Sequence, residues 1–195
     1  SVLVATIRAL KFHGGVARED LTQENLPALR VGLANLNRHI NNLRENYGVP
    51  AVVSINQFVS DTDAEVALVM EHCNALGVKV ALSSHWANGG AGATDLAHMV
   101  AEICDADSTP ANRPHDSFVY SAELSLWEKL EAVATKVYHA SEITANTKVR
   151  DRIKELTDGG YGHLPVCIAK TPYSFSTDPA LKGAPTDHVM DIREV

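Results

Sequence analysis

Val52-Val53-Ser54-Ile55-Asn56-Gln57-Phe58 and Val80-Ala81-Leu82-Ser83-Ser84-His85-Trp86 are the two stretches that decide the fold. Each is a short apolar run that ends in polar residues and an aromatic, and a helical pattern follows each of them. Strands separated by helices predict right-handed crossovers and a parallel sheet. Ligands bind outside the carboxyl ends of the strands in such sheets, so we expect Phe58 and Trp86 to meet at one binding rim.

The same alternation of strands and helices extends along residues 1–105. A first strand is expected at residues 1–7, and a turn at residues 11–15 follows it. Thr62-Asp63-Ala64-Glu65 has the form of a capping box, in which the Thr hydroxyl and the Glu carboxylate satisfy free amides at the start of a helix. The predicted fold class is therefore α/β, with a three-layer unit built on a parallel sheet.

A change of composition divides the chain. Residues 106–123 are rich in Pro, Asp, Ser and Asn without periodicity, so we interpret them as a linker. Residues 124–195 predict a small, partial α+β domain with two helices and strands, and a second capping box, Ser125-Leu126-Trp127-Glu128, begins its first helix. Residues 164–169 are an apolar run that we expect to form a buried strand.

The composition limits the classes of partner. The chain has 195 residues and a formal net charge of -7, which disfavours a nucleic-acid groove, and no apolar run approaches a membrane span. Cys73, Cys104 and Cys167 lie inside apolar patterns, so we expect buried thiols in a reducing compartment, the cytoplasm. No histidine has the spacing of a zinc site, so no metal site is predicted. Strand-like patterns at both ends indicate a segment of a longer protein.

Two segments are candidates for binding an anion. The loop Asn88-Gly89-Gly90-Ala91-Gly92 precedes a helix and is suited to present backbone amides to a phosphate or carboxylate, although glycines serve any tight turn equally well. Lys170 and Thr171 offer a cation and a hydroxyl, with a solvated turn as the alternative. Arg8 and Lys11, after the first strand, have the same status. The chain contains no Walker A motif.

Several motifs in order resemble the formate–tetrahydrofolate ligase family over nearly the whole chain. The motifs are residues 4–15, residues 52–58 with Asp61-Thr62-Asp63-Ala64-Glu65, residues 85–93 and residues 164–176. The resemblance implies an enzyme that uses ATP and Mg²⁺ to join formate to tetrahydrofolate through formyl phosphate. It also implies that this chain is a middle to later part of such an enzyme, beginning with the closing strands of a P-loop-type domain.

The resemblance assigns a pterin-binding role to four residues. The stacking aromatics of the family fall on Phe58 and Trp86, Val59 stands where the family usually has Pro, and Leu82 matches an apolar wall position. Tetrahydrofolate is then the small-molecule substrate of this segment. ATP and Mg²⁺ are not expected to bind the segment well, and the isolated chain is expected to be inactive.

Several departures from the family pattern are present, and two of them keep an alternative open. Asn88 replaces a Lys, Ala91 replaces a Glu, His139 stands where Gly is favoured and His188 where Phe is common. The first two remove a cation and an anion next to the expected site, which mildly favours a stand-alone, non-catalytic folate-binding or oligomer-forming remnant. Unpaired sheet edges lead us to expect a homo-oligomer in either case.

Overall fold

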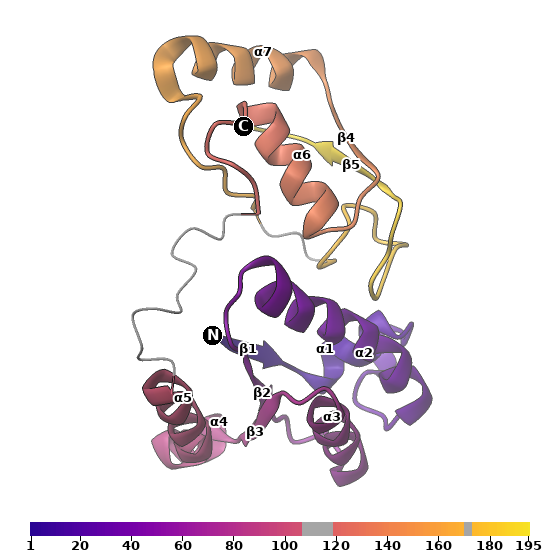
Figure 1. Cartoon of the computed structure of the whole chain (residues 1–195). Helices are drawn as coiled ribbons and strands as arrows, with labels where there is room; N and C mark the ends of the chain where they lie inside the picture. Colours follow the sequence, from indigo (N-terminus) through magenta and orange to yellow (C-terminus); the bar gives the residue numbers. More distant parts are fainter. Residues whose placement is uncertain (107–118, 170–172) are drawn as a thin grey trace. The chain divides into compact units, whose positions relative to one another are not determined.

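The computed structural model describes residues 1–106, 119–169 and 173–195 and divides the chain into two compact units (Figure 1). Unit 1 comprises residues 1–115, and unit 2 comprises residues 116–195. The expected linker at 106–123 falls largely on residues 107–118, which lie outside the described residues. Within the described ranges, no helix combines the length and the apolar character needed to cross a membrane. Each unit has its own hydrophobic core.

Unit 1 is built on a three-stranded parallel sheet in the order β1-β2-β3. The strands are β1 (Val2–Ala5), β2 (Val52–Asn56) and β3 (Lys79–Ser83). The register aligns Val53 of β2 with Leu3 of β1 and with Val80 of β3. The prediction of an α/β unit with a parallel sheet is confirmed.

Helices separate the strands of unit 1. Leu29, Leu33, Leu36 and Ile40 recur at three- and four-residue steps, and all four are buried in the core. The helices are α1 (Ile7–His13), a 3₁₀ turn (Arg18–Asp20), α2 (Leu26–Asn41), a π turn (Asn42–Asn46), α3 (Asp63–Ala75), α4 (His85–Asn88), a 3₁₀ turn (Gly89–Ala93) and α5 (Thr94–Ala106).

The predicted capping box at the start of α3 is confirmed. The amide of Glu65 donates to Thr62 Oγ1 at 3.2 Å, and the amide of Thr62 donates to Glu65 Oε2 at 3.2 Å. Two amides that a helix start leaves unsatisfied thus gain partners within the motif itself. The helix consequently begins at a fixed residue, two positions after Asp61 of the loop that follows β2.

The turn expected at residues 11–15 is wrong for the most part, because α1 extends from Ile7 to His13. Thr6 caps this helix, with its Oγ1 accepting from the amide of Ala9 at 3.2 Å. The helix crosses α2 in backbone contact: a Cβ on Gly32 would lie 1.8 Å from the carbonyl oxygen of Leu10, and one on Gly14 would lie 1.8 Å from that of Ala28. The pattern of residues 7–13 alone cannot reveal a contact with Gly32, which lies nineteen positions after the end of the helix.

Unit 2 packs helices against a two-stranded parallel sheet. Its elements are α6 (Leu126–Lys136), β4 (Glu142–Ala145), α7 (Thr147–Leu156), a π turn (Thr157–Tyr161) and β5 (Val189–Ile192). The capping box predicted at the start of α6 is present, with the amide of Glu128 donating to Ser125 Oγ at 3.3 Å and the amide of Ser125 donating to Glu128 Oε2 at 2.8 Å.

The buried strand expected at residues 164–169 is wrong. Leu164 is exposed and Val166 and Ile168 are only partly buried against the core of unit 2. The Tyr120 hydroxyl accepts from the amide of Val166 at 2.9 Å and donates to its carbonyl oxygen at 3.3 Å. A side chain therefore takes the place that a neighbouring strand would occupy, and no ladder forms in this segment.

Two of the three cysteines are exposed, which corrects the expectation of three buried thiols. Cys73 is buried in the core of unit 1, whereas Cys104 and Cys167 are exposed. Cys104 lies on α5, none of whose residues is fully buried, and Cys167 lies in the segment that is not a strand. The apolar sequence around Cys104 and Cys167 did not predict their exposure, because other parts of the described chain do not cover these two segments completely.

Candidate functional site

The carboxyl ends of β2 and β3 lie next to each other. The register aligns Asn56 with Ser83, and the amide of Gln57 donates to the carbonyl oxygen of Ser83 at 3.1 Å. Phe58 follows this bridge by one residue and Trp86 by three. We call residues 57–62 and 82–88 together the rim. The structure thus brings the two predicted aromatics to the same edge of the sheet.

The four residues predicted to bind a heterocycle differ in their exposure. Val59 is 88% exposed, Trp86 is 61% exposed and Leu82 is 36% exposed, while Phe58 is half-buried. Leu82 aligns with Ile55 of the core at the end of β3. Trp86 is thus not a core residue of unit 1, and an exposed aromatic beside apolar neighbours suits the recognition of a flat ring.

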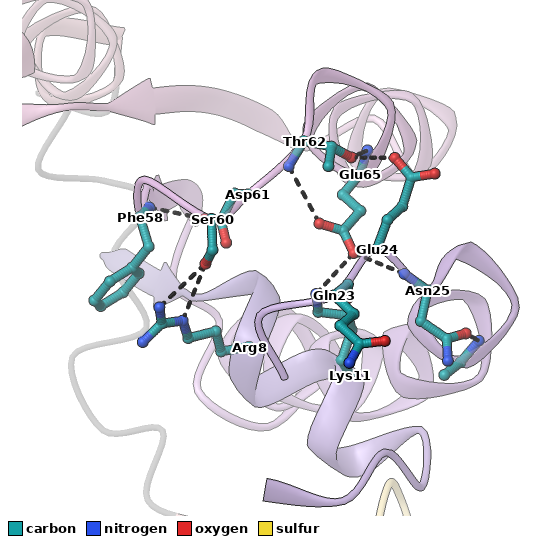
Figure 2. A network of polar contacts seen from close by, with 11 residues as sticks. Arg8, Lys11, Gln23, Glu24, Asn25, Phe58, Ser60, Asp61, Thr62 and Glu65 are labelled. Carbon is teal, nitrogen blue, oxygen red and sulfur yellow. Dashed lines mark hydrogen bonds and ion pairs between the residues drawn. The ribbon is translucent and has the colours of Figure 1, made fainter. Parts of the chain in front are cut away.

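The loop after β2 holds Phe58 in a fixed place. The amide of Phe58 donates to Asp61 Oδ2 at 2.8 Å, and the amide of Asp61 donates to the carbonyl oxygen of Phe58 at 3.0 Å. Arg8 places its guanidinium over the Phe58 ring, 4.7 Å from Cζ to the ring centroid, and donates to Ser60 Oγ (Figure 2). Both the backbone and the ring of Phe58 therefore have partners.

Asp61 is a carboxylate with one oxygen satisfied and one not. Its Oδ2 accepts from Phe58, whereas its Oδ1 is buried without a hydrogen-bond partner among the described residues. Burial, followed by the negative charge of Glu65, raises the pKa of Asp61, although the bond from Phe58 acts in the opposite direction. The loop consequently contains a carboxyl group that takes up a proton more readily than usual.

A buried ion pair joins α1 to the first turn of α3, next to the end of the rim at Thr62. Lys11 Nζ is 2.8 Å from Glu65 Oε1, both side chains have no exposed surface, and Lys11 also donates to the carbonyl oxygen of Gln23 at 2.7 Å (Figure 2). Glu65 accepts in addition from the amides of Asn25 and Thr62 at 3.0 and 3.2 Å. Lys11 is thus engaged within the core and is unsuited to bind an anion, which corrects the expectation drawn from the sequence.

The environment of Glu65 favours its charged form. Burial by itself raises the pKa of this carboxyl, but the hydrogen bond from Lys11 and those from the amides of Asn25 and Thr62 outweigh burial and lower it. Glu65 therefore stays ionised while it joins α1, the segment before α2 and the first turn of α3. This connection fixes the start of α3 and, with it, one end of the rim.

The glycine-rich loop has structural reasons for two of its glycines. Gly89 adopts φ 57° and ψ -146°, a conformation that side chains disfavour, and a Cβ on Gly92 would lie 2.6 Å from the backbone carbon of Ser84. The amide of Ser84 donates to the carbonyl oxygen of Gly92 at 3.0 Å, and Asn88 Nδ2 donates to Ser84 Oγ at 2.9 Å. A Cβ on Gly89 or on Gly90 would meet no neighbouring atom, and anion binding by this loop stays a prediction.

Two further sequence predictions concern anions and metals. Lys170 and Thr171 lie outside the described residues, so their suggested contact with an anion stays a prediction. Among residues 1–106, 119–169 and 173–195, no group of three His, Cys, Asp or Glu side chains is placed to hold a metal ion.

The sequence reasoning missed the residues that support Phe58. The sequence patterns assign no role to Ser60, include Asp61 only within a motif of the family, and suggest Arg8 only for contact with an anion. The available signal was the spacing Phe58-x-x-Asp61, since an Asp side chain readily bonds a nearby backbone amide in a turn. The contact between Arg8 and Phe58 had no local signal, because fifty residues separate the two in the sequence.

Unit 2 contains a cavity of about 1090 Å³ that the sequence did not predict. Apolar side chains of α6 and α7 and the segment around Val166 form much of its wall, and the residues that follow β5 form another part. Four charged residues also line it, namely Arg152, Asp191, Arg193 and Glu194. The rim of unit 1 is the candidate site to which the sequence patterns and the paired strand ends both point.

Comparison with known proteins matches the whole chain to one family. The family model described as formate–tetrahydrofolate ligase matches residues 1–195. Curated formate–tetrahydrofolate ligases of Methylococcus capsulatus, Methylibium petroleiphilum and Pelagibacter ubique are 57%, 53% and 50% identical to the chain over 194 residues. Each alignment covers 100% of this chain and 34% of the relative.

The chain belongs to the formate–tetrahydrofolate ligase family. It spans about a third of the length of the curated relatives that it matches. The resemblance noted in the sequence is thereby confirmed at the level of the family. Because the chain corresponds to only part of each relative, the reaction of the whole enzyme and the role of this part in it are matters for proposal.

Proposed function

We propose that this chain is the part of a formate–tetrahydrofolate ligase that binds the pterin ring of tetrahydrofolate. The whole enzyme would form 10-formyltetrahydrofolate from formate, tetrahydrofolate and ATP through formyl phosphate. The observation that carries the proposal is the rim, where the Gln57–Ser83 hydrogen bond brings the residues after β2 and β3 together. Phe58 and Trp86 would stack on the heterocycle, with Val59 and Leu82 as apolar neighbours.

The chemistry assigned to this chain is orientation rather than phosphoryl transfer. A stacked ring held on a fixed rim presents its amine in one direction, which lowers the entropic barrier to attack on an activated formyl group. Stacking on an aromatic side chain contributes about 1–3 kcal/mol per ring, by analogy with nucleic-acid bases. We assign no step of the reaction of ATP to the described residues.

The parallel sheet of unit 1 fits, as part of the same proposal, the closing strands of a P-loop-type domain. The phosphate-binding loop would then come from elsewhere in the enzyme, since the chain has no Gly-x-x-x-x-Gly-Lys-Ser/Thr sequence. The isolated chain would accordingly be inactive as a ligase. The exposed valines of the edge strand β1, Val2 and Val4, support the further proposal that this surface is covered in an assembly, either by the same enzyme or by a second copy.

The second candidate is a folate-binding remnant without catalytic activity. It is favoured by Asn88 and Ala91, which remove a cation and an anion that the family places near the rim. The two candidates make the same prediction for folate binding and differ in activity. Adding the missing parts of the ligase would restore activity only under the first.

The experiment is an anaerobic titration of the 195-residue chain with tetrahydrofolate, followed by tryptophan fluorescence, with ATP titrated in parallel. Trp127→Phe removes the second tryptophan, so the signal reports on Trp86 alone. We expect saturable quenching by tetrahydrofolate and no response to ATP. Absence of any response to tetrahydrofolate at millimolar concentration would contradict a pterin site that is complete within this chain.

A further inference from the structure

One face of the Phe58 ring is already occupied within the protein. The guanidinium of Arg8, on α1, lies over this ring at 4.7 Å, and Figure 2 shows the two side chains next to each other beside Ser60. A guanidinium at this distance from an aromatic ring is attracted by the negative charge of the ring face. A flat ligand can therefore stack only on the opposite face of Phe58.

The guanidinium does not depend on the ring alone for its position. Arg8 Nε donates to Ser60 Oγ at 3.3 Å, and Arg8 Nη2 donates to the same oxygen at 3.1 Å. Two bonds from one planar group to one acceptor hold that group close to the Ser60 hydroxyl, with the oxygen near its plane. Because Ser60 is only two residues from Phe58, the loop carries both the ring and the anchor of the cation that covers it.

Asp61 holds the backbone of Phe58 through hydrogen bonds that do not involve Arg8. The amide of Phe58 donates to Asp61 Oδ2 at 2.8 Å, and the carbonyl oxygen of Phe58 accepts from the amide of Asp61 at 3.0 Å. With the backbone held in this way, rotation about the side-chain bonds is the main freedom left to the ring. The contact with Arg8 acts on that remaining freedom.

We propose that Arg8 is a positioning residue that acts on the pterin ring through Phe58. This inference rests on the proposed function. The Arg8 guanidinium holds the Phe58 ring in one orientation and reserves one face for the ligand. Its positive charge also offsets the negative charge of the ring face, which reduces repulsion between two stacked π systems.

The first test compares two ligands and two substitutions in the 195-residue chain. Arg8→Met keeps an unbranched side chain and removes the charge, whereas Arg8→Lys keeps the charge without the planar fork. We expect Arg8→Met to weaken tetrahydrofolate and 6-methyltetrahydropterin equally, by about threefold to tenfold, with a smaller loss for Arg8→Lys. A loss confined to tetrahydrofolate would overturn the inference, because it would indicate direct contact with the glutamate carboxylates.

A double-mutant cycle separates action through Phe58 from other effects. In a Phe58→Leu background, Arg8→Met should cause no further loss of affinity, since the ring that Arg8 positions is absent. An additive loss would overturn the inference. Arg150→Met is the matched control, because Arg150 lies over the Trp127 ring at 4.4 Å in unit 2 and is expected to leave both affinities unchanged.

A measurement without ligand keeps the inference testable if the isolated chain does not bind folate. With 4-fluorophenylalanine at position 58, Arg8→Met should move the ¹⁹F resonance, while Arg150→Met should not. An unchanged resonance, with thermal unfolding also unchanged, would show that Arg8 does not control the ring. Failure of wild-type binding together with a moved resonance would contradict the proposed function of the isolated chain and support the role of Arg8.

Discussion

Lys11 and Glu65 form an ion pair of 2.8 Å in which neither side chain has any exposed surface. The pair joins α1 to the first turn of α3, and the same carboxylate accepts from the amides of Asn25 and Thr62. Taking two charges out of water is expensive, so the two groups stabilise the fold only together. Three segments that are distant in the sequence thus depend on one contact.

Replacing Lys11 should destabilise unit 1 strongly. Lys11→Met leaves the Glu65 carboxylate buried without its cation, and we expect a loss of about 3–5 kcal/mol in the free energy of unfolding. Lys79→Met is the control, because the Lys79–Glu102 pair is exposed and its loss should change stability by about 1 kcal/mol or less. Urea denaturation measures both, and similar losses for the two variants would contradict the importance assigned to burial.

The contribution of Glu65 should depend on pH in the acid range. Its pKa in the folded chain is lowered from the ordinary value of 4.5, so its stabilising effect is complete above that value. The effect is lost as the pH falls through the folded pKa. Glu65→Gln should therefore be much less stable than wild type at pH 7. The difference between their free energies of unfolding should become smaller below about pH 4.5. A difference in free energy of unfolding that stays constant down to pH 3 would show that the charge of Glu65 does not contribute to stability.

The three thiols should react at two very different rates. Cys104 and Cys167 are exposed, whereas Cys73 is buried and its pKa is raised to about 11 by burial. We expect two thiols to react rapidly with a disulfide reagent at pH 8 and the third only after unfolding. Mass spectrometry of peptides identifies the labelled residues. Rapid labelling of Cys73 in the native chain would contradict the core described for unit 1.

Replacing His188 with phenylalanine should stabilise unit 2. Both ring nitrogens of His188 are buried without a hydrogen-bond partner among the described residues, which costs about 1–3 kcal/mol for an unsatisfied polar group. His188→Phe removes these nitrogens and should raise the melting temperature by several degrees. His163→Phe, at an exposed histidine, is the control and should give no gain. A lower melting temperature for His188→Phe would indicate that the site does not accommodate the larger ring.

Truncating Trp86 should affect binding without affecting the fold. Trp86 is 61% exposed, so Trp86→Ala removes a stacking surface and very little of the core. We expect the affinity for tetrahydrofolate to fall by at least about tenfold while the melting temperature stays the same. Calorimetry is suitable for this variant, since the fluorescent reporter itself is lost. Tyr161→Ala, at another exposed aromatic, should leave the affinity unchanged.

The sequence predicted those features that depend on neighbouring residues. Both capping boxes, the parallel strands ending at Asn56 and Ser83, and the delivery of Phe58 and Trp86 to one edge follow from local patterns and from general rules for parallel sheets. The assignment of these aromatics to a pterin site stays a prediction, because it came from resemblance to a family.

The features that the sequence did not predict depend on contacts between distant residues. The helix α1 relies on the absence of a side chain at Gly32, and the cation over Phe58 comes from Arg8 of α1. The segment around Val166 failed to form a strand because the Tyr120 hydroxyl satisfies its backbone. None of these relationships is visible in a window of a few residues, since each joins segments brought together by folding.

The crossing of α1 and α2 has a consequence for how the rim tolerates mutation. At Gly14 and Gly32 the two helices touch through their backbones, and any side chain there would overlap a carbonyl oxygen. Where side chains separate two helices, a substitution that changes their volume also changes the distance between the helices. At this crossing no side chain lies between the two backbones, so such substitutions have no effect on the distance. Arg8 and Lys11 both lie on α1. Their distance from α2 is therefore set by the backbone contact and not by the surrounding hydrophobic side chains. Substitutions in the core around this crossing should therefore leave the geometry that supports Phe58 unchanged.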